Sequence, residues 1–209
     1  MTQVQVKICG ITDKVALATA AAAGADWVGF VFFPPSPRAL APAQAAALSA
    51  GLPDGPGRVG LFVDPTDAEV AAVLDALLLD ALQIYAPAER VAALRARFGR
   101  PVWRAIGVAT AADLPAEAGA ADRFVLEAKP PAAATRPGGN ATAFDWSLLR
   151  GWRAPAPWLL AGGLTPATVA AAIRATGAAA VDVSSGVERA PGVKDPALIR
   201  AFIAAARAA

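Results

Sequence analysis

Eight short, β-rich segments alternate with alanine-rich segments of helical spacing along the chain of 209 residues. This alternation constrains the fold most, because each crossover between parallel strands needs about a dozen residues, usually in a helix. An open doubly wound sheet is possible, but eight units in one run favour a single closed (β/α)8 TIM barrel. The strands are expected at residues 4–9, 27–32, 58–63, 81–85, 102–108, 123–127, 158–161 and 180–184.

Helices are expected between these strands and after the last one. Asp13 and Thr66 supply capping oxygens for helix starts, and Gly99 and Gly177 stand where helices should end. No linker rich in Gly, Ser or Pro divides the sequence, so residues 1–209 are expected to form one barrel domain. The helices are placed at residues 13–23, 43–50, 66–78, 87–97, 110–118, 146–149, 166–176 and 196–208.

Composition argues against several classes of partner and location. The net charge is only +2 and the arginines are scattered, so nucleic acid is not an expected partner. The most apolar stretch, residues 15–35, is interrupted by Gly24, Asp26 and two prolines, so no membrane helix is expected. The N-terminus lacks a signal-peptide pattern, and one cysteine allows no internal disulfide, which fits the cytoplasm. A monomer is expected, because no helix carries an extra apolar face.

The sequence contains no histidine. This excludes His-based catalytic triads, most zinc sites and a histidine general base. Proton transfer would therefore fall to carboxylates, a thiol, a lysine or a tyrosine.

The first strand carries the only cysteine, Cys9. Side chains two apart share one face of a strand, so Cys9 and Lys7 point to the side opposite the apolar row of this strand. A lone cysteine is usually an inert core residue, whereas a neighbouring cation can lower a thiol pKa and activate it. Closure of the barrel would set the eighth strand beside the first, so Lys7 is expected to pair with Asp182 below the thiol. The aspartate would then weaken the effect of Lys7 on the thiol pKa.

Glycine- and serine-rich turns follow the last two expected strands: Gly162-Gly163 and Ser184-Ser185-Gly186. Such turns expose backbone N–H groups, and a nearby helix N-terminus adds partial positive charge, so they can hold a phosphate. Two ordinary tight turns are the alternative, but loops after strands seven and eight are the usual phosphate site of this fold. Two further loops, residues 36–38 and 129–140, belong to the same carboxyl-terminal face, where active sites are built.

Seven motifs extend from the first strand to the region before the last helix: Lys7-Ile8-Cys9-Gly10-Ile11-Thr12, Gly29-Phe30-Val31-Phe32, Ser36-Pro37-Arg38, Val59-Gly60-Leu61-Phe62-Val63, Phe144-Asp145-Trp146, Leu160-Ala161-Gly162-Gly163-Leu164 and Asp182-Val183-Ser184-Ser185-Gly186-Val187-Glu188. In these motifs the chain resembles phosphoribosylanthranilate isomerase. The resemblance implies a cofactor-free Amadori rearrangement of N-(5-phosphoribosyl)anthranilate to 1-(2-carboxyphenylamino)-1-deoxyribulose 5-phosphate in tryptophan biosynthesis.

The resemblance also implies roles for individual residues. Cys9 matches the base that removes the sugar C2 proton. Arg38 matches the arginine near the anthranilate carboxylate, for which a planar guanidinium is suited. The substrate phosphate would bind at Gly162, Gly163, Ser184, Ser185 and Gly186.

The sequence departs from the family pattern at three places. The general acid, usually aspartate at the end of strand six, is here Glu127, whose carboxyl extends one methylene further. Tyr85 stands where the family usually has histidine, and no chemical role is assigned to it. The stretch 138–141 reads Gly-Gly-Asn-Ala, where the family usually has Gly-Gly-Thr-Gly.

Other interpretations follow from these departures. Glu127 could be a buried structural residue neutralised by Lys7, Arg104 or Lys129, and Arg38 could be an ordinary solvated arginine. The whole chain could be a phosphorylated-ligand-binding barrel that has lost catalysis. A related sugar-phosphate isomerase with paired aspartates is disfavoured, since strand one ends in Cys9 and strand five offers no carboxylate.

Overall fold

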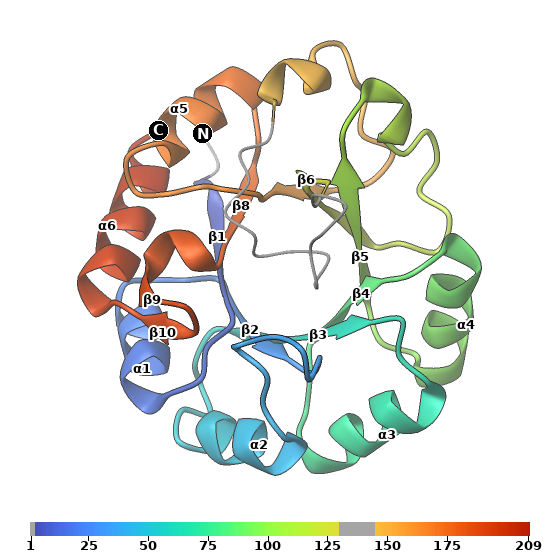
Figure 1. The fold of residues 1–209 in the computed structure, drawn as a ribbon, viewed down its shortest axis with the longest axis vertical. Coiled ribbons are helices and arrows are strands. Elements are labelled where there is room, and N and C mark those ends of the chain that lie inside the picture. Colours follow the sequence, from blue (N-terminus) through green and yellow to red (C-terminus); the bar gives the residue numbers. More distant parts are fainter. Residues whose placement is uncertain (1–2, 130–144) are drawn as a thin grey trace.

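The computed structural model describes residues 3–129 and 145–209. Eight parallel strands form a closed barrel with the helices outside it, which confirms the predicted (β/α)8 fold (Figure 1). The sequence-based strand bounds agree with the observed ones to within one residue at each end. The strands are β1 (Gln5–Cys9), β2 (Trp27–Val31), β3 (Gly57–Val63), β4 (Ala81–Tyr85), β5 (Val102–Val108), β6 (Arg123–Ala128), β7 (Trp158–Leu160) and β8 (Ala180–Val183).

Six α-helices cover the barrel over the described ranges, fewer than the eight expected helical segments. They are α1 (Lys14–Ala22), α2 (Pro42–Ala50), α3 (Asp67–Ala76), α4 (Ala88–Phe98), α5 (Val169–Thr176) and α6 (Pro196–Arg207). The predicted caps are present: Asp13 Oδ1 accepts from Ala16 N at 2.8 Å, and Thr66 forms a capping box with Glu69. The expected helix at residues 146–149 is the 3₁₀ turn η2 (Trp146–Leu149).

The helix predicted at residues 110–118 is wrong. Only a single 3₁₀ turn, η1 (Ala111–Asp113), forms there. Asp113 Oδ2 accepts from the backbone N–H of Thr110 at 2.8 Å, which satisfies a helix-start donor at once. Pro115 then follows, and Gly119 has a φ of 56°. A proline and a left-handed glycine within six residues prevent the turn from continuing as an α-helix.

A short hairpin of β9 (Glu188–Ala190) and β10 (Val193–Lys194) was not predicted. It follows β8 and the 3₁₀ turn η3 (Ser185–Val187). Strands of two or three residues leave no alternating pattern in the sequence, so the hairpin had no local signal.

A repeated hydrogen bond orders the barrel strands in pairs. An aspartate just before an even-numbered strand accepts from the first N–H groups of the odd-numbered strand before it. Asp80 Oδ2 accepts from Arg58 N at 2.6 Å, and Asp122 Oδ2 accepts from Val102 N at 2.8 Å. Asp26 Oδ2 does the same for Val6 N at 2.7 Å. These carboxylates satisfy backbone donors that would otherwise be unpaired at strand starts.

Side chains of the strands divide between two layers. One alternate row packs against the helices and forms the main core, which includes Ile8, Phe30 and Phe124. The other row fills the barrel interior with two smaller clusters, one around Val59, Val125 and Leu159, the other around Cys9, Val31 and Leu61. The interior is thus packed, and only its two ends can host a site.

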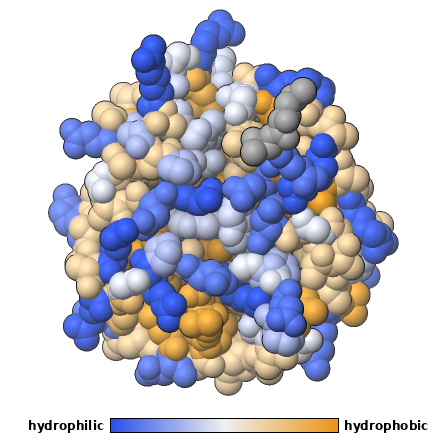
Figure 2. Space-filling view, turned by 180° about the vertical axis from the view of Figure 1, so that it is seen from behind, coloured by the Kyte–Doolittle hydropathy of each residue, from blue (hydrophilic) through white to orange (hydrophobic). Residues whose placement is uncertain are grey.

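The amino-terminal end of the barrel is closed by stacked side chains. The guanidinium of Arg123 lies 5.0 Å from the ring centroid of Trp27 and 5.5 Å from that of Trp103. Figure 2 shows this face, with hydrophilic side chains gathered across its middle.

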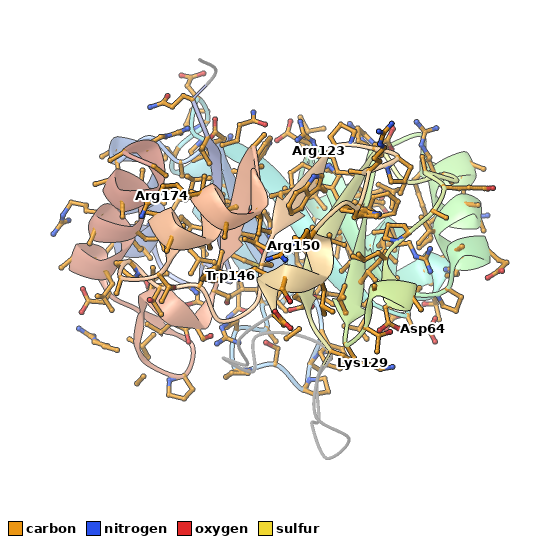
Figure 3. All side chains as sticks on the ribbon, turned by 90° about the horizontal axis from the view of Figure 1, so that it is seen from above. Asp64, Arg123, Lys129, Trp146, Arg150 and Arg174 are labelled. Atoms are coloured by element: carbon orange, nitrogen blue, oxygen red, sulfur yellow. The ribbon has the colours of Figure 1, made fainter. Side chains whose placement is uncertain are left out.

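The carboxyl-terminal end holds the loops that follow the strands. Figure 3 places Arg123, at the start of β6, at one end of the molecule, whereas Lys129 after β6 and Asp64 after β3 both lie toward the other end. The candidate site therefore lies at the end marked by Lys129. Most of the loop expected at residues 129–140, the stretch 138–141 and Phe144 lie outside the described residues. Within the described ranges, none of the helices has the length and apolar character needed to cross a bilayer.

Candidate active site at the carboxyl-terminal mouth

The end of β1 sets a thiol above a buried ion pair. Lys7 is completely buried, and its Nζ lies 3.0 Å from Asp182 Oδ1. This pairing was predicted from barrel closure and is confirmed, since the β1–β8 register places the two residues side by side. Cys9, two residues nearer the mouth, is 4% exposed. A Cβ on Gly29 would lie 2.9 Å from Cys9 Sγ and 3.2 Å from Lys7 Nζ, so a glycine on β2 leaves room for both.

The ion pair tunes the thiol only in part. Burial raises the pKa of Cys9, the Lys7 ammonium counteracts this, and the Asp182 carboxylate adds to the increase. Burial alone would lower the pKa of Lys7, but Asp182 and Cys9 outweigh it and hold that pKa above its ordinary value. Lys7 therefore stays charged beneath a thiol that is less acidic than in water.

Glu127 faces the interior near the mouth end of β6. It lies two residues beyond Val125, which belongs to an interior cluster, and it is 6% exposed. Lys7, one expected neutralising partner, is engaged by Asp182. Arg104, another, lies between the inward residues Trp103 and Ala105 and so belongs to the outward row of β5.

Tyr85, at the end of β4, lies between the two predicted catalytic groups. Its ring packs against the interior cluster that contains Cys9. Burial raises the pKa of the Tyr85 phenol well above its ordinary value, and the negative charge of the nearby Glu127 carboxylate raises it further. Cys9 and Asp182 also contribute, so all four groups share one electrostatic environment at the mouth.

The two turns predicted to bind phosphate adjoin each other. Gly162 and Gly163 after β7 have φ values of 82° and 65°, a region that side-chain-bearing residues rarely adopt. A Cβ on Gly186 after β8 would overlap the carbonyl oxygen of Leu164, which follows the first turn. Ser184 precedes η3 and Ser185 begins it, and both are half-buried. The glycines therefore permit a close approach of two backbone segments at one edge of the mouth.

Arg38 belongs to a buried charge cluster. Its Nε and an Nη donate to the two carboxylate oxygens of Glu188 at 2.7 and 2.8 Å. Lys194 Nζ donates to Glu188 Oε1 at 2.8 Å and to the Ser184 carbonyl at 2.9 Å. Since Arg38 is 4% exposed, the solvated-arginine interpretation is wrong. The cluster holds two cations and one carboxylate, which leaves it with net positive charge beside the β8 turn.

Charge neutralisation governs the protonation of this cluster. Burial would raise the pKa of Glu188, but Arg38 and Lys194 lower it below its ordinary value. Burial lowers the pKa of Lys194, and Glu188 offsets part of this. Gly10 makes room for the cluster, because a Cβ there would overlap Arg38 Cδ and lie 3.2 Å from Ser184 Oγ.

The sequence analysis assigns no role to Glu188 or Lys194, although Glu188 ends the last family motif and Lys194 lies six residues beyond it. Their chemistry depends on Arg38, which is 150 residues away along the chain. The available signal was the presence of two charged residues next to a glycine turn at a barrel mouth. Among the residues that the structure describes, no group of three His, Cys, Asp or Glu side chains is placed to hold a metal ion.

A closed barrel with a thiol, a carboxyl group and paired glycine turns at its carboxyl-terminal mouth has the layout of a (β/α)8 enzyme for a phosphorylated small molecule. A family model described as N-(5'phosphoribosyl)anthranilate (PRA) isomerase matches residues 6–205. The N-(5'-phosphoribosyl)anthranilate isomerase of Acidiphilium cryptum (strain JF-5) is 62% identical over 205 residues, which cover 97% of this chain and 98% of that protein. The chain therefore belongs to the N-(5'-phosphoribosyl)anthranilate isomerase family.

Solved structures agree with this assignment. The phosphoribosyl anthranilate isomerase of Thermotoga maritima is 37% identical, with a TM-score of 0.86 over 99% of this chain and 100% of that one. A phosphoribosyl anthranilate isomerase in complex with reduced 1-(O-carboxyphenylamino)-1-deoxyribulose 5-phosphate is 35% identical, with a TM-score of 0.84 and the same coverage.

Proposed function

We propose that the chain converts N-(5-phosphoribosyl)anthranilate to 1-(2-carboxyphenylamino)-1-deoxyribulose 5-phosphate, with Cys9 as base and Glu127 as acid. The observation that carries the assignment of roles is that both groups face the interior at the same mouth, with Tyr85 between them. The likeness to a relative solved with a reduced form of the product supports the choice of substrate.

The reaction consists of four proton transfers, two to and two from the substrate, and involves no net redox change. Glu127 gives a proton to the furanose ring oxygen, the bond between that oxygen and C1 breaks, and C1 becomes an iminium carbon. The Cys9 thiolate removes the C2 proton. The electron pair of the broken C2–H bond forms the C1–C2 double bond, and the iminium becomes an enamine. Protonation at C1 and loss of the hydroxyl proton at C2 then give the ketone. The resemblance implies no cofactor, and these steps call for none.

Two other regions would position the substrate. The backbone N–H groups of the Gly162-Gly163 and Ser184-Ser185-Gly186 turns would hold the phosphate, which is supported by their close approach. The positive cluster of Arg38 and Lys194 would attract the anthranilate carboxylate, because one carboxylate, Glu188, does not neutralise two cations.

Steady-state kinetics of two variants test the chemical roles. Glu127→Gln should lose at least about a hundredfold in kcat with KM within a few fold, because general acid catalysis typically contributes that much. Cys9→Ser should lose a similar factor, since a serine hydroxyl is a far weaker acid than a thiol and supplies almost no conjugate base. Exposed Glu89 on α4 offers a matched control, and Glu89→Gln should retain wild-type turnover.

Near-normal turnover in either site variant would remove that residue from its role. Arg38→Ala should mainly raise KM, and an unchanged KM would remove Arg38 from the substrate site. Complementation of an auxotroph that lacks this isomerase distinguishes the enzyme from the binding-only barrel. Growth excludes the binding-only interpretation, and failure with folded, expressed protein supports it.

The setting of the reaction is also proposed. We expect residues 1–209 to act as one barrel domain in the cytoplasm and as a monomer. The exposed large apolar side chains in the described ranges are Val15, Leu78 and Val193. Val15 lies on α1, Leu78 follows α3 and Val193 lies on β10, so no single helix presents a row of them.

A further inference from the structure

Tyr85 has no role in the scheme above, yet it occupies the space between the base and the acid. It ends β4 on the inward row, two residues beyond Gln83, and packs against the cluster of Cys9, Val31 and Leu61. Its ring also packs against the interior cluster that includes Val125, the inward neighbour of Glu127 on β6. The phenol thus contacts the walls that carry both predicted catalytic groups.

Little side-chain volume separates Tyr85 from the acid, because β5 lies between β4 and β6 and its inward residues at this level are Ala105 and Gly107. Burial has the largest effect on the phenol, and the charge of the nearby Glu127 carboxylate raises its pKa further. A phenol of raised pKa keeps its proton at neutral pH and can only donate to a carboxylate. Glu127 is 6% exposed, so a protein donor replaces part of the solvation that water would give its charged form.

We propose that Tyr85 is the positioning residue for the general acid, and that its hydroxyl donates to the Glu127 carboxyl group and stabilises the charge left on it after proton transfer. This inference rests on the acid role proposed for Glu127. The length of the Glu127 side chain makes the pairing possible. An aspartate at this position would hold its carboxyl group nearer to β6 and farther from β4.

The proposed effect on the reaction follows from charge development. When Glu127 protonates the ring oxygen, a full negative charge appears on a buried carboxylate. A fixed donor aimed at that charge lowers the barrier without reorganisation. The same donor occupies one carboxyl oxygen, so the proton of the acid form is kept on the other oxygen, which is available to the substrate.

Tyr85→Phe removes the hydroxyl and keeps the ring. We expect kcat to fall about tenfold, which corresponds to about 1.4 kcal/mol of transition-state stabilisation, with KM changed less than about twofold. The alkaline limb of the kcat–pH profile should move to higher pH, because loss of the donor favours the protonated form of Glu127. A purely structural role for the ring would leave this limb where it is.

A double-mutant cycle separates positioning from packing. In a Glu127→Asp background the acid is retained but its carboxyl is withdrawn, so Tyr85→Phe should cost less than about twofold there. An equal cost in both backgrounds would overturn the proposal, as would an unshifted pH profile with wild-type kcat. Thermal melting and the near-ultraviolet CD spectrum of Tyr85→Phe check that the barrel is folded.

The outcomes distinguish this inference from the proposed function. Absence of isomerase activity in the wild-type protein, or full activity in Glu127→Gln, overturns the function or the acid role itself. An active wild-type enzyme that depends on Glu127 but not on the Tyr85 hydroxyl overturns only the inference about Tyr85.

Discussion

Cys9 is a weak acid in this environment, and that has a direct chemical consequence. A base acts in its deprotonated form, and the pKa of the thiol is raised by burial more than Lys7 lowers it. Only a small fraction of Cys9 is therefore thiolate at neutral pH, and that fraction grows as the pH rises. The low fraction need not prevent catalysis, because a base of higher pKa accepts a proton more strongly once it is deprotonated.

Alkylation of Cys9 measures this directly, because it is the only cysteine in the chain. The rate with iodoacetamide, followed by intact mass, should increase with pH through a midpoint above that of an ordinary thiol. A small thiol compound treated in parallel gives the reference midpoint. A midpoint below the reference would show an activated thiol and would contradict the balance of charges described for this site.

Lys7→Met should destabilise the barrel by about 3 to 5 kcal/mol, because it leaves Asp182 as an uncompensated buried charge. The midpoint of Cys9 alkylation should also move to higher pH, since Lys7 is the largest influence that lowers the thiol pKa. Urea unfolding followed by CD measures the first effect. Lys14→Met on exposed α1 is the matched control and should change neither quantity.

The sign of the pH dependence for this pair is fixed by Lys7. Its folded pKa is raised above the ordinary value of 10.5, so the pair stabilises fully below that pH. The stabilisation is lost as the pH rises through the folded pKa. Unfolding experiments on the wild type and on Lys7→Met should therefore converge at strongly alkaline pH.

At the scale of elements, the β9–β10 hairpin joins β8 to the loop after β2. Glu188 begins β9 and binds Arg38, while Lys194 ends β10 and binds both Glu188 and the Ser184 carbonyl. The hairpin thereby fixes the turn expected to hold phosphate relative to the arginine expected to meet the carboxylate. The distance between the two substrate anions would be set by this arrangement.

Glu188→Gln should lower stability at pH 7 by about 2 kcal/mol, because two charge-assisted interactions are weakened. The folded pKa of Glu188 is lowered from 4.5, so its contribution is present above that pH and lost as the pH falls through the folded pKa. The difference between wild type and variant in urea unfolding should therefore shrink on acidification. Glu89→Gln, on exposed α4, should show no such difference at either pH.

Gly186→Ala tests the contact between the two turns. The new Cβ would overlap the Leu164 carbonyl oxygen and lie 3.2 Å from Val183 Cγ2, so the turns must separate. We expect KM for the phosphorylated substrate and the inhibition constant for inorganic phosphate to rise at least about tenfold, equivalent to the loss of roughly one good hydrogen bond. Gly51→Ala is the control, because its nearest neighbour would be 3.4 Å away. Unchanged phosphate inhibition would remove these turns from the phosphate site.

At the scale of the whole molecule, the two ends of the barrel differ in structure. Arg123 packs over both Trp27 and Trp103, whose rings contact each other, at the amino-terminal end. The carboxyl-terminal end carries the buried charges and glycine turns. This division follows from parallel strands, whose carboxyl ends all meet at one edge and bring their loops together.

Light scattering coupled to size-exclusion chromatography tests the predicted monomer. The expected mass is that of one chain, 21.0 kDa. A mass of twice that value, unchanged on dilution, would contradict the expectation. The apolar groove between α1 and α6, lined by Val15, Ala18 and Ile203, would then be the first surface to examine by mutation.

The alternation of strands and helices, together with turn residues, was sufficient to predict the barrel, the strand bounds and the Lys7–Asp182 pair. The strand bounds follow from local periodicity, and the Lys7–Asp182 pair follows from barrel closure, which makes the last strand the neighbour of the first. The predicted helix at residues 110–118 does not form, because Pro115 and Gly119 interrupt a segment whose alanine content favours a helix. The cluster of Arg38, Glu188 and Lys194 and the approach of Tyr85 to Glu127 appear only in the tertiary structure. Such contacts join residues far apart in sequence, and they depend on loop paths and side-chain reach that no local pattern records.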